Sequence, residues 1–244
     1  MPSLGIVVFV VLFVGVAALV IVASRKERKI WSARPAILRA LAARRGYRVV
    51  ENPGKPSEIV PIRPLDRAPD LRKLELPVAV AGRTLDADFT LFDVYHERQP
   101  KYSKNRSTFR SYETFITIKS DGKQWPHFEL MSTPIDASSF TGKLLEMTGN
   151  LAAGLMKERG LVHVPVHDHP GFQLYVADGA DGEAFRDALL PLFTNRGAWW
   201  IGALDDALTL QRTTNLVPEK DLDRFVDEAF EIERAARTAI RKDS

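Results

Sequence analysis

The residues that decide the fold class read VAVAGRTLDADFTLFDVYHE, from Val78 to Glu97. Two runs of strand-forming residues flank Gly82-Arg83, which predicts an antiparallel hairpin. Along the second run one face carries alternate residues: Leu85, Ala87, Phe89, Leu91, Asp93 and Tyr95. Because Phe92 and Val94 lie on the other face, we expect both faces to be covered at this end. Asp93 interrupts an apolar face, so it is the acid to examine for burial.

The segments that follow mix strands and helices. Residues 109–120 alternate, and Asp121-Gly122 predicts a turn into 124–132, which gives an antiparallel meander with Pro126 at an edge or a bulge. Further segments follow in order: a helix within 138–160, strands at 161–167 and 170–178, a helix at 182–193, and two strands around Asp205-Asp206. The last helix begins at Pro218, and its apolar residues predict a buried stripe: Leu222, Phe225, Val226, Ala229 and Ile232 or Glu233. We therefore expect an α+β fold with a mostly antiparallel sheet and packed helices.

The amino-terminal segment Leu4–Ala23 has twenty residues without a charged side chain. This length matches a hydrocarbon core of roughly 30 Å, which predicts a transmembrane helix. The apolar run is long and no basic residue precedes it, which disfavours a cleaved signal peptide. Basic residues follow it, so the positive-inside rule predicts a single-pass inner-membrane protein with its amino terminus outside and its carboxyl domain in the cytoplasm. We expect these residues at the membrane interface: Arg25, Lys26, Arg28, Lys29 and Trp31.

The charge is distributed unevenly along the chain. The net charge is +3, yet residues 1–48 hold nine basic residues and one acid, which leaves −5 for the remainder. A nucleic-acid-binding domain would show the reverse distribution, so we expect no nucleic-acid partner. The basic flank instead predicts contact with the lipid bilayer and its anionic headgroups. The chain has no cysteine, which excludes disulfides and cysteine nucleophiles.

These patterns divide the chain into four parts. Residues 1–24 form the transmembrane anchor, and residues 25–51 form a basic juxtamembrane helix and a first strand, with Pro35 in the first helical turn and Gly46 ending the helix. Residues 52–77 are a proline-rich connector, in which we expect neither a helix nor a central strand. Residues 78–244 form the α+β cytosolic domain; if it divides, its two subdomains are expected to meet near 135–160.

The stretch HVPVHDHP, from His163 to Pro170, holds three of the five histidines. If the strand continues, Val162, Val164 and Val166 point into the core and the histidines point outward. Strand zinc sites also use His-x-His, so His163, His167 and His169 remain candidate metal ligands. Other catalytic and nucleotide-binding motifs are missing, and we predict no catalytic residue and no cofactor. We interpret the aromatic residues of 92–128 as core or cross-strand pairs.

The layout resembles a family of bacterial single-pass membrane proteins of unknown function. The residues that carry the resemblance are ILRALAARRGYRVV (37–50), VAGRTLDADFTLFDVYH (80–96), WPHFELMS (125–132) and PGFQLYVADGADGEAFRDALL (170–190). The resemblance implies an amino-terminal transmembrane helix, a basic flank and an α+β cytosolic domain. It implies no activity, cofactor or catalytic residue, and the histidines of 163–169 fall outside the shared pattern.

Three functions remain open at this point. The first is a membrane-tethered cytosolic binding or scaffold protein with an unidentified protein partner. The second is a metal-dependent enzyme that uses the histidine cluster, which predicts stoichiometric zinc that a His167→Ala, His169→Ala double variant loses. The third is an accessory subunit of a larger membrane complex. We expect the first.

Overall fold

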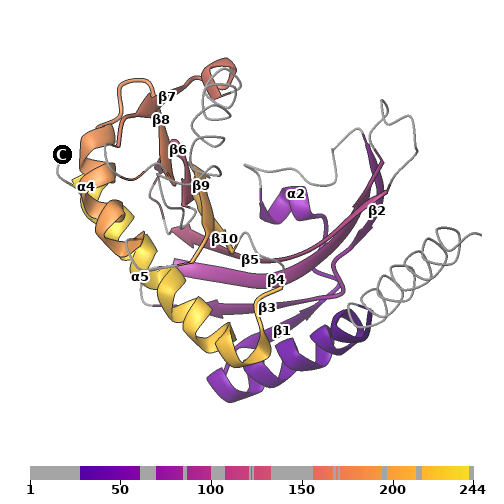
Figure 1. Cartoon of the computed structure of the whole chain (residues 1–244). Coiled ribbons are helices and arrows are strands. Elements are labelled where there is room, and N and C mark those ends of the chain that lie inside the picture. Colours follow the sequence, from indigo (N-terminus) through magenta and orange to yellow (C-terminus); the bar gives the residue numbers. More distant parts are fainter. Residues whose placement is uncertain are drawn as a thin grey trace, which may run out of the picture.

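The α+β class is confirmed in the computed structural model, which contains one large antiparallel sheet with helices packed on it (Figure 1). The structure describes residues 28–60, 70–84, 87–99, 108–120, 122, 124–132, 156–166, 169, 171–193, 197–212 and 216–241. Strands from before and after residues 135–160 lie in the same sheet. Among the described residues, no helix combines the length and apolar character needed to span a bilayer. The segment 4–23 lies outside them.

The described residues contribute ten strands to the sheet. Their bounds are β1 Arg48–Glu51, β2 Leu71–Glu75, β3 Val78–Arg83, β4 Ala87–Arg98, β5 Phe109–Ser120, β6 Trp125–Ser132, β7 Leu161–Val164, β8 Phe172–Ala177, β9 Trp199–Asp205 and β10 Ala207–Arg212. The spatial order is β1-β3-β4-β5-β10-β9-β6-β8-β7, and β2 pairs with the far half of β4. All the strand pairs are antiparallel.

The predicted β3–β4 hairpin is confirmed, with Ala79 opposite Phe92 and Arg83 opposite Asp88. The prediction for the proline-rich connector is wrong for the helix, because the connector contains the short helix α2, Pro56–Ile59; it also contains the strand β2. A proline fits the first position of a helix, where its missing N–H has no partner to lose. Since β2 pairs only with β4, it is an edge strand, which agrees with the expectation.

The predicted meander is wrong at one point, because β6 does not pair with β5. The β9–β10 hairpin lies between them, with β10 on β5 and β9 on β6. Pro126 was predicted to lie at an edge or at a bulge, and the structure confirms the bulge, because the register between β6 and β9 shifts between Trp125 and Phe128. A turn signal specifies a local chain reversal, but it does not decide which strand occupies the neighbouring place in the sheet.

Within the described part of the chain, three helices cover the outer face of the curved sheet: the helix over residues 28–45, α4 (Gly182–Phe193) and α5 (Leu222–Arg241). A 3-10 turn, Glu219–Asp221, precedes α5. The prediction that Pro35 lies in a first helical turn is wrong, because the helix already includes residue 28. The predicted end at Gly46 is confirmed. Its φ is +68°, and the N–H of Tyr47 donates to the carbonyl of Ala42 at 2.8 Å.

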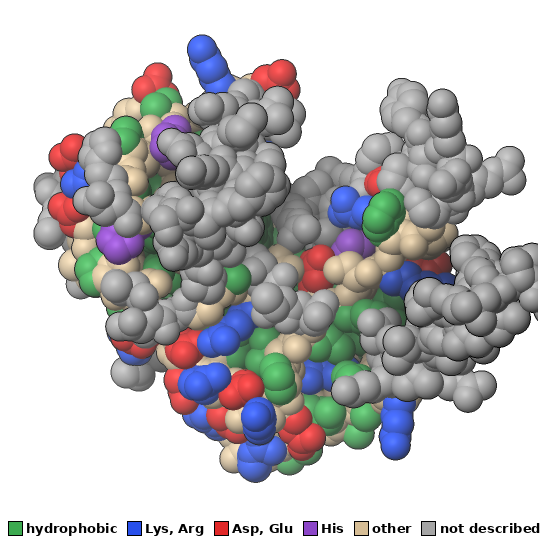
Figure 2. All heavy atoms as spheres, viewed as in Figure 1, with side chains coloured by type: hydrophobic (Ala, Val, Ile, Leu, Met, Phe, Trp, Pro, Cys, Tyr) green, Lys and Arg blue, Asp and Glu red, His purple; other side chains and the backbone are tan. Residues whose placement is uncertain are grey.

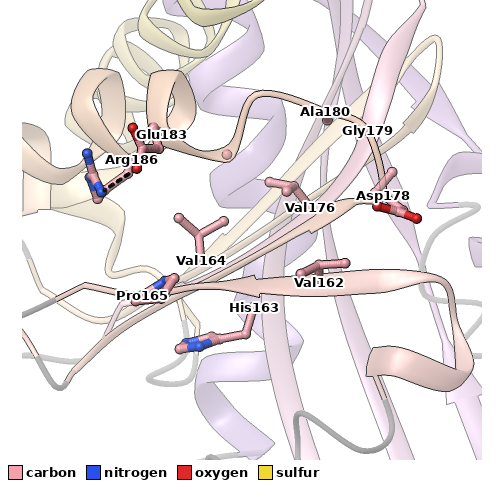
Figure 3. A pocket seen from close by; sticks show the side chains of 12 residues that line it. Val162, His163, Val164, Pro165, Val176, Asp178, Gly179, Ala180, Glu183 and Arg186 are labelled. Atoms are coloured by element: carbon pink, nitrogen blue, oxygen red, sulfur yellow. Dashed lines mark ion pairs between the residues drawn. The ribbon is translucent and has the colours of Figure 1, made fainter.

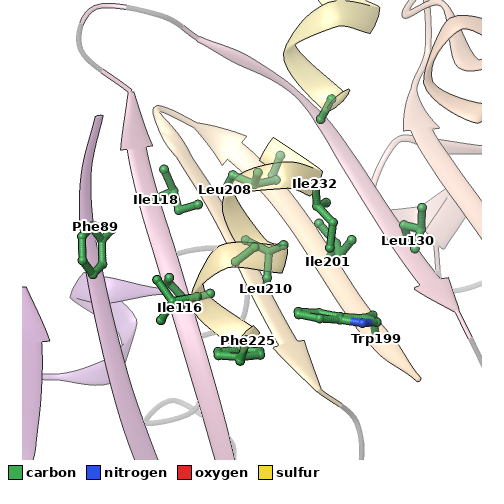
Figure 4. Close-up of a cluster of buried hydrophobic side chains, with 14 of the residues drawn as sticks. Phe89, Ile116, Ile118, Leu130, Trp199, Ile201, Leu208, Leu210, Phe225 and Ile232 are labelled. Atoms are coloured by element: carbon green, nitrogen blue, oxygen red, sulfur yellow. The ribbon is translucent and has the colours of Figure 1, made fainter. Parts of the chain in front are cut away.

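The main hydrophobic core lies between the sheet and these helices (Figure 4). The predicted stripe of α5 is confirmed, and both Ile232 and Glu233 are buried. Trp199 of β9 stacks on Phe225 of α5, with 5.2 Å between ring centroids. A smaller second core, around Phe92 and Phe115, lies on the inner face of the sheet beneath α2. The expectation that both faces of β4 are covered around Phe92 and Val94 is therefore confirmed.

Candidate functional site

The histidine stretch begins in β7, which ends at Val164 and does not reach His167 as predicted. Pro165 follows immediately and has no N–H to donate to a strand ladder, which accounts for the early end. His163 is exposed, and its ring lies 5.2 Å from that of Tyr175, on the face opposite Val164 (Figure 3). The predicted burial of Val162 is wrong, since it is 52% exposed. It shares the face of Val164, but β7 is the last strand and an open cleft adjoins this side chain.

The histidines do not form a metal centre within the described residues. There, no group of three His, Asp or Glu side chains is arranged to hold an ion. His169 is exposed, and His167 lies outside the described part of the chain. Although the side chain is exposed overall, partial desolvation of the ring lowers the pKa of His163, so the folded state favours the neutral imidazole, the form that ligates metals. The zinc hypothesis stays a prediction.

A cleft of about 380 Å³ lies between β7 and the start of α4 (Figure 3). Its floor is apolar and consists of Val162 and Val164 from β7 and Val176 from β8. Gly182, the first residue of α4, allows the helix to begin directly against β7. A Cβ atom at this position would lie 2.4 Å from Cγ2 of Val164. The cleft therefore depends on a glycine at the helix start.

The charged side chains that line this cleft are Asp178, Glu183 and Arg186. Asp181 accepts the N–H of Ala184 at 2.9 Å and so caps α4. Arg186 lies 3.8 Å from Glu183 at the rim. The described lining residues include no hydroxyl, thiol or amine side chain that could act as a nucleophile. An apolar floor with charged side chains at the rim suits the binding of an apolar side chain.

The outer side of β7 gives the cleft a second binding element. β7 is the final strand of the sheet, and no described strand pairs with this side. An edge strand of this kind can take up an extended peptide through its backbone, while an adjoining pocket accepts alternate side chains. The cleft adjoins the exposed Val162 at this edge. The backbone edge and the pocket together therefore match the geometry of strand addition.

A buried ion pair ties the 28–45 helix to the sheet. Arg34 and Asp93 are 2% and 1% exposed, and they form two hydrogen bonds, Nε to Oδ2 at 2.7 Å and Nη2 to Oδ1 at 3.0 Å. Arg34 also donates to the carbonyl of Val217 at 2.8 Å, and Thr114 donates to Asp93 at 2.6 Å. We call this set the helix clamp. Asp93, the acid singled out for examination, is buried, whereas nothing in the sequence signalled the burial of Arg34, which belongs to the segment interpreted as the basic juxtamembrane helix.

A second buried polar set on the inner face was missed by sequence reasoning. Nε2 of His96 lies 3.2 Å from Oε1 of Glu113, and the hydroxyl of Ser111 donates to the same oxygen at 2.9 Å. A serine–histidine–acid relay would require a bond from the serine to the histidine, whereas here both groups contact the acid. His96 continues the face of Phe92 and Val94 by alternation, and this was the available signal for its burial.

The residues predicted at the membrane interface are placed as follows. Arg28 and Lys29 are exposed, while Arg25 and Lys26 lie outside the described residues. Trp31 is half-buried, and its Nε1 donates to Glu75 at 2.9 Å while its ring lies 5.5 Å from that of Tyr112. The ammonium of Lys73, 2.6 Å away, lowers the pKa of Glu75, and the indole N–H lowers it further. Trp31 therefore fastens the start of the helix to the sheet.

The comparisons with known proteins add no relative. No family model matches the chain, and neither a curated protein nor a solved structure is significantly similar to it.

Proposed function

We propose that this protein is a membrane-tethered cytosolic binding or scaffold protein. The observation that carries the proposal is the helix clamp, because it holds the 28–45 helix rigidly on the sheet. Only residues 24–27 separate this helix from the apolar segment 4–23, and four residues span at most about 14 Å. A transmembrane segment at 4–23 would therefore hold the folded domain close to the bilayer without a long flexible linker.

The surface that we assign to the partner is the edge of β7 with its cleft. Six interstrand steps separate β7 from β4, which the 28–45 helix contacts through the clamp. At about 4.8 Å a step, this is roughly 30 Å along the sheet. The edge thus lies far from the start of the 28–45 helix, where the proposed tether joins the domain (Figure 1). We expect the partner to be an extended peptide segment that places an apolar side chain on Val162 and Val164.

The tether and its orientation are tested first. The wild-type chain should remain with membranes after an alkaline carbonate wash. Since it has no cysteine, Val162→Cys provides a unique thiol on an exposed side chain. A membrane-impermeant maleimide should react with this thiol only after the cells are permeabilised. Release by carbonate, or labelling of intact cells, would contradict a cytoplasmic domain on a membrane tether.

Photo-crosslinking tests the binding surface in the same membranes. A benzoylphenylalanine at Glu183, on the rim of the cleft, should form a discrete adduct, whereas one at Thr238, exposed on α5, should not. Val162→Lys places a charge on the floor of the cleft and should abolish the Glu183 adduct, while Val162→Ile should retain it. Equal adducts at both positions, or an adduct that Val162→Lys leaves unchanged, would assign the partner to another surface.

A further inference from the structure

The end of the sheet beside the start of the 28–45 helix exposes two large apolar side chains. Ile30 is 44% exposed and Phe109 is 61% exposed. Phe109 begins β5, and Tyr112, three residues later, contacts Trp31, the neighbour of Ile30. Strand alternation places Phe109 on the opposite face of β5 from Tyr112, so the two exposed side chains flank the same end of the domain from the two faces of the sheet. We call this end the tether pole, and it comprises residues 28–31, 70–75, 95–98 and 108–112.

The tether pole is basic, whereas the opposite end of the sheet is acidic. The pole contains six Lys or Arg and three Asp or Glu residues: Arg28, Lys29, Arg72, Lys73, Arg98 and Arg110 against Asp70, Glu75 and Glu97. The described residues of 156–193, at the β7 end, contain three basic and five acidic residues. The charge is thus polarised along the sheet, and an anionic surface attracts the tether pole and repels the β7 end.

The charges within the pole leave several basic groups for an external anion. Lys73 is paired with Glu75 at 2.6 Å, and Arg110 with Glu97 at 3.1 Å. These two pairs account for two of the three acids. Arg28 lies within electrostatic reach of Lys73, and its side chain is exposed, as is that of Arg72. Exposed cations beside a solvent-facing phenylalanine and isoleucine form the combination that binds at an anionic bilayer surface.

We propose that the tether pole lies directly on the anionic leaflet of the membrane, with Phe109 and Ile30 inserted at the headgroup level. The inference rests on the proposed membrane tether, because the apolar segment ends at Ala23, five residues before Arg28. Trp31 and the helix clamp fasten this part of the chain to the sheet. Contact at the pole therefore sets the orientation of the whole domain, and it directs the edge of β7 away from the bilayer.

The absence of cysteine allows a direct test with the full-length chain. Phe109→Cys and Val162→Cys each introduce a single thiol at an exposed apolar position, one at the pole and one at the opposite end. Each variant is labelled with an environment-sensitive fluorophore and reconstituted into nanodiscs. One set contains phosphatidylcholine alone and the other phosphatidylcholine with phosphatidylglycerol. Spin-labelled lipids in the nanodisc serve as the quencher, so that only contact with lipid reduces the emission.

The label at position 109 should show blue-shifted emission and lipid quenching in the anionic nanodiscs. Both effects should weaken in phosphatidylcholine, and also in salt near 1 M, where charges are screened beyond about 3 Å. The label at 162 should remain unquenched throughout. If the protein has entered the nanodisc and the label at 109 is not quenched, the membrane contact of the tether pole is overturned, but the proposed tether is not. Failure of the chain to enter nanodiscs overturns the proposed tether as well. A label at 109 that is shielded in native membranes but not quenched by lipid marks a protein contact, and it likewise overturns the inference.

Discussion

Replacement of Arg34 by methionine should strongly destabilise the domain. Three hydrogen bonds are lost, at 2.7, 3.0 and 2.8 Å, and the carboxylate of Asp93 keeps only the bond from Thr114. Asp93 is 1% exposed, so water does not replace the missing cation. Removal of one partner from a buried ion pair costs about 3–5 kcal/mol. For a domain of this size, that corresponds to a fall in Tm of roughly 6–20 °C.

A double variant distinguishes the cost of leaving one buried charge unpaired from the cost of changing the packing of the two side chains. Asp93→Asn alone also leaves a buried charge without its partner, whereas Arg34→Met with Asp93→Asn leaves no buried charge at the clamp. Thr114 can still donate to the amide oxygen at position 93. The double variant should therefore be more stable than the sum of the single effects predicts, by about 1–3 kcal/mol.

Thermal unfolding of the full chain in mild detergent, followed by tryptophan fluorescence, measures these effects. Trp199 is fully buried and stacks on Phe225, so its emission reports the loss of the main core. Arg39→Met is the matched control, because Arg39 lies on the same helix and forms a solvent-exposed pair with Glu51. Its removal should cost at most about 1 kcal/mol. Equal Tm values for the Arg34 and Arg39 variants, or additive effects in the double variant, would refute the reasoning.

Three further outcomes are expected. Gly182→Ala should cost about 1–3 kcal/mol in thermal unfolding, because the new methyl group overlaps Val164; an unchanged Tm would mean that the start of α4 can move away from β7. Partial desolvation lowers the pKa of both His127 and His163 in the folded state, so the unfolded chain binds protons at a higher pH than the folded chain does. The two neutral histidines therefore contribute to the free energy of unfolding fully above about pH 6.5, and this contribution declines at lower pH. The loss in Tm between pH 7.5 and 5.5 should be smaller in a His127→Gln, His163→Gln double variant. Arg45→Met should lower Tm by only a few degrees, because its pairs with Asp223 and Asp227 lie in the exposed, mixed-charge surface that Figure 2 shows over α5; a loss as large as that of Arg34→Met would contradict this.

Local patterns determined the elements that depend on neighbours in sequence. The β3–β4 hairpin follows from alternation around Gly82, and the buried stripe of α5 follows from its helical period. The sequence also indicated that Asp93 should be examined for burial, because it is a single acid on an otherwise apolar face, and the residue is buried. In each case the signal lies within a few residues of the feature that it predicts.

Only the tertiary structure decided which elements meet. Residues 199–212 insert between β5 and β6, although 124–132 follow β5 directly in sequence. Arg34 reads as one more basic residue of the flank until the fold brings it to Asp93, 59 positions later. Val162 reads as a core residue, but β7 is the last strand and its cleft leaves the side chain open. The periodicity of the sequence indicates which side chains can be buried. The order of the strands decides which surface covers each of them, and this order depends on pairing between segments that are distant in sequence.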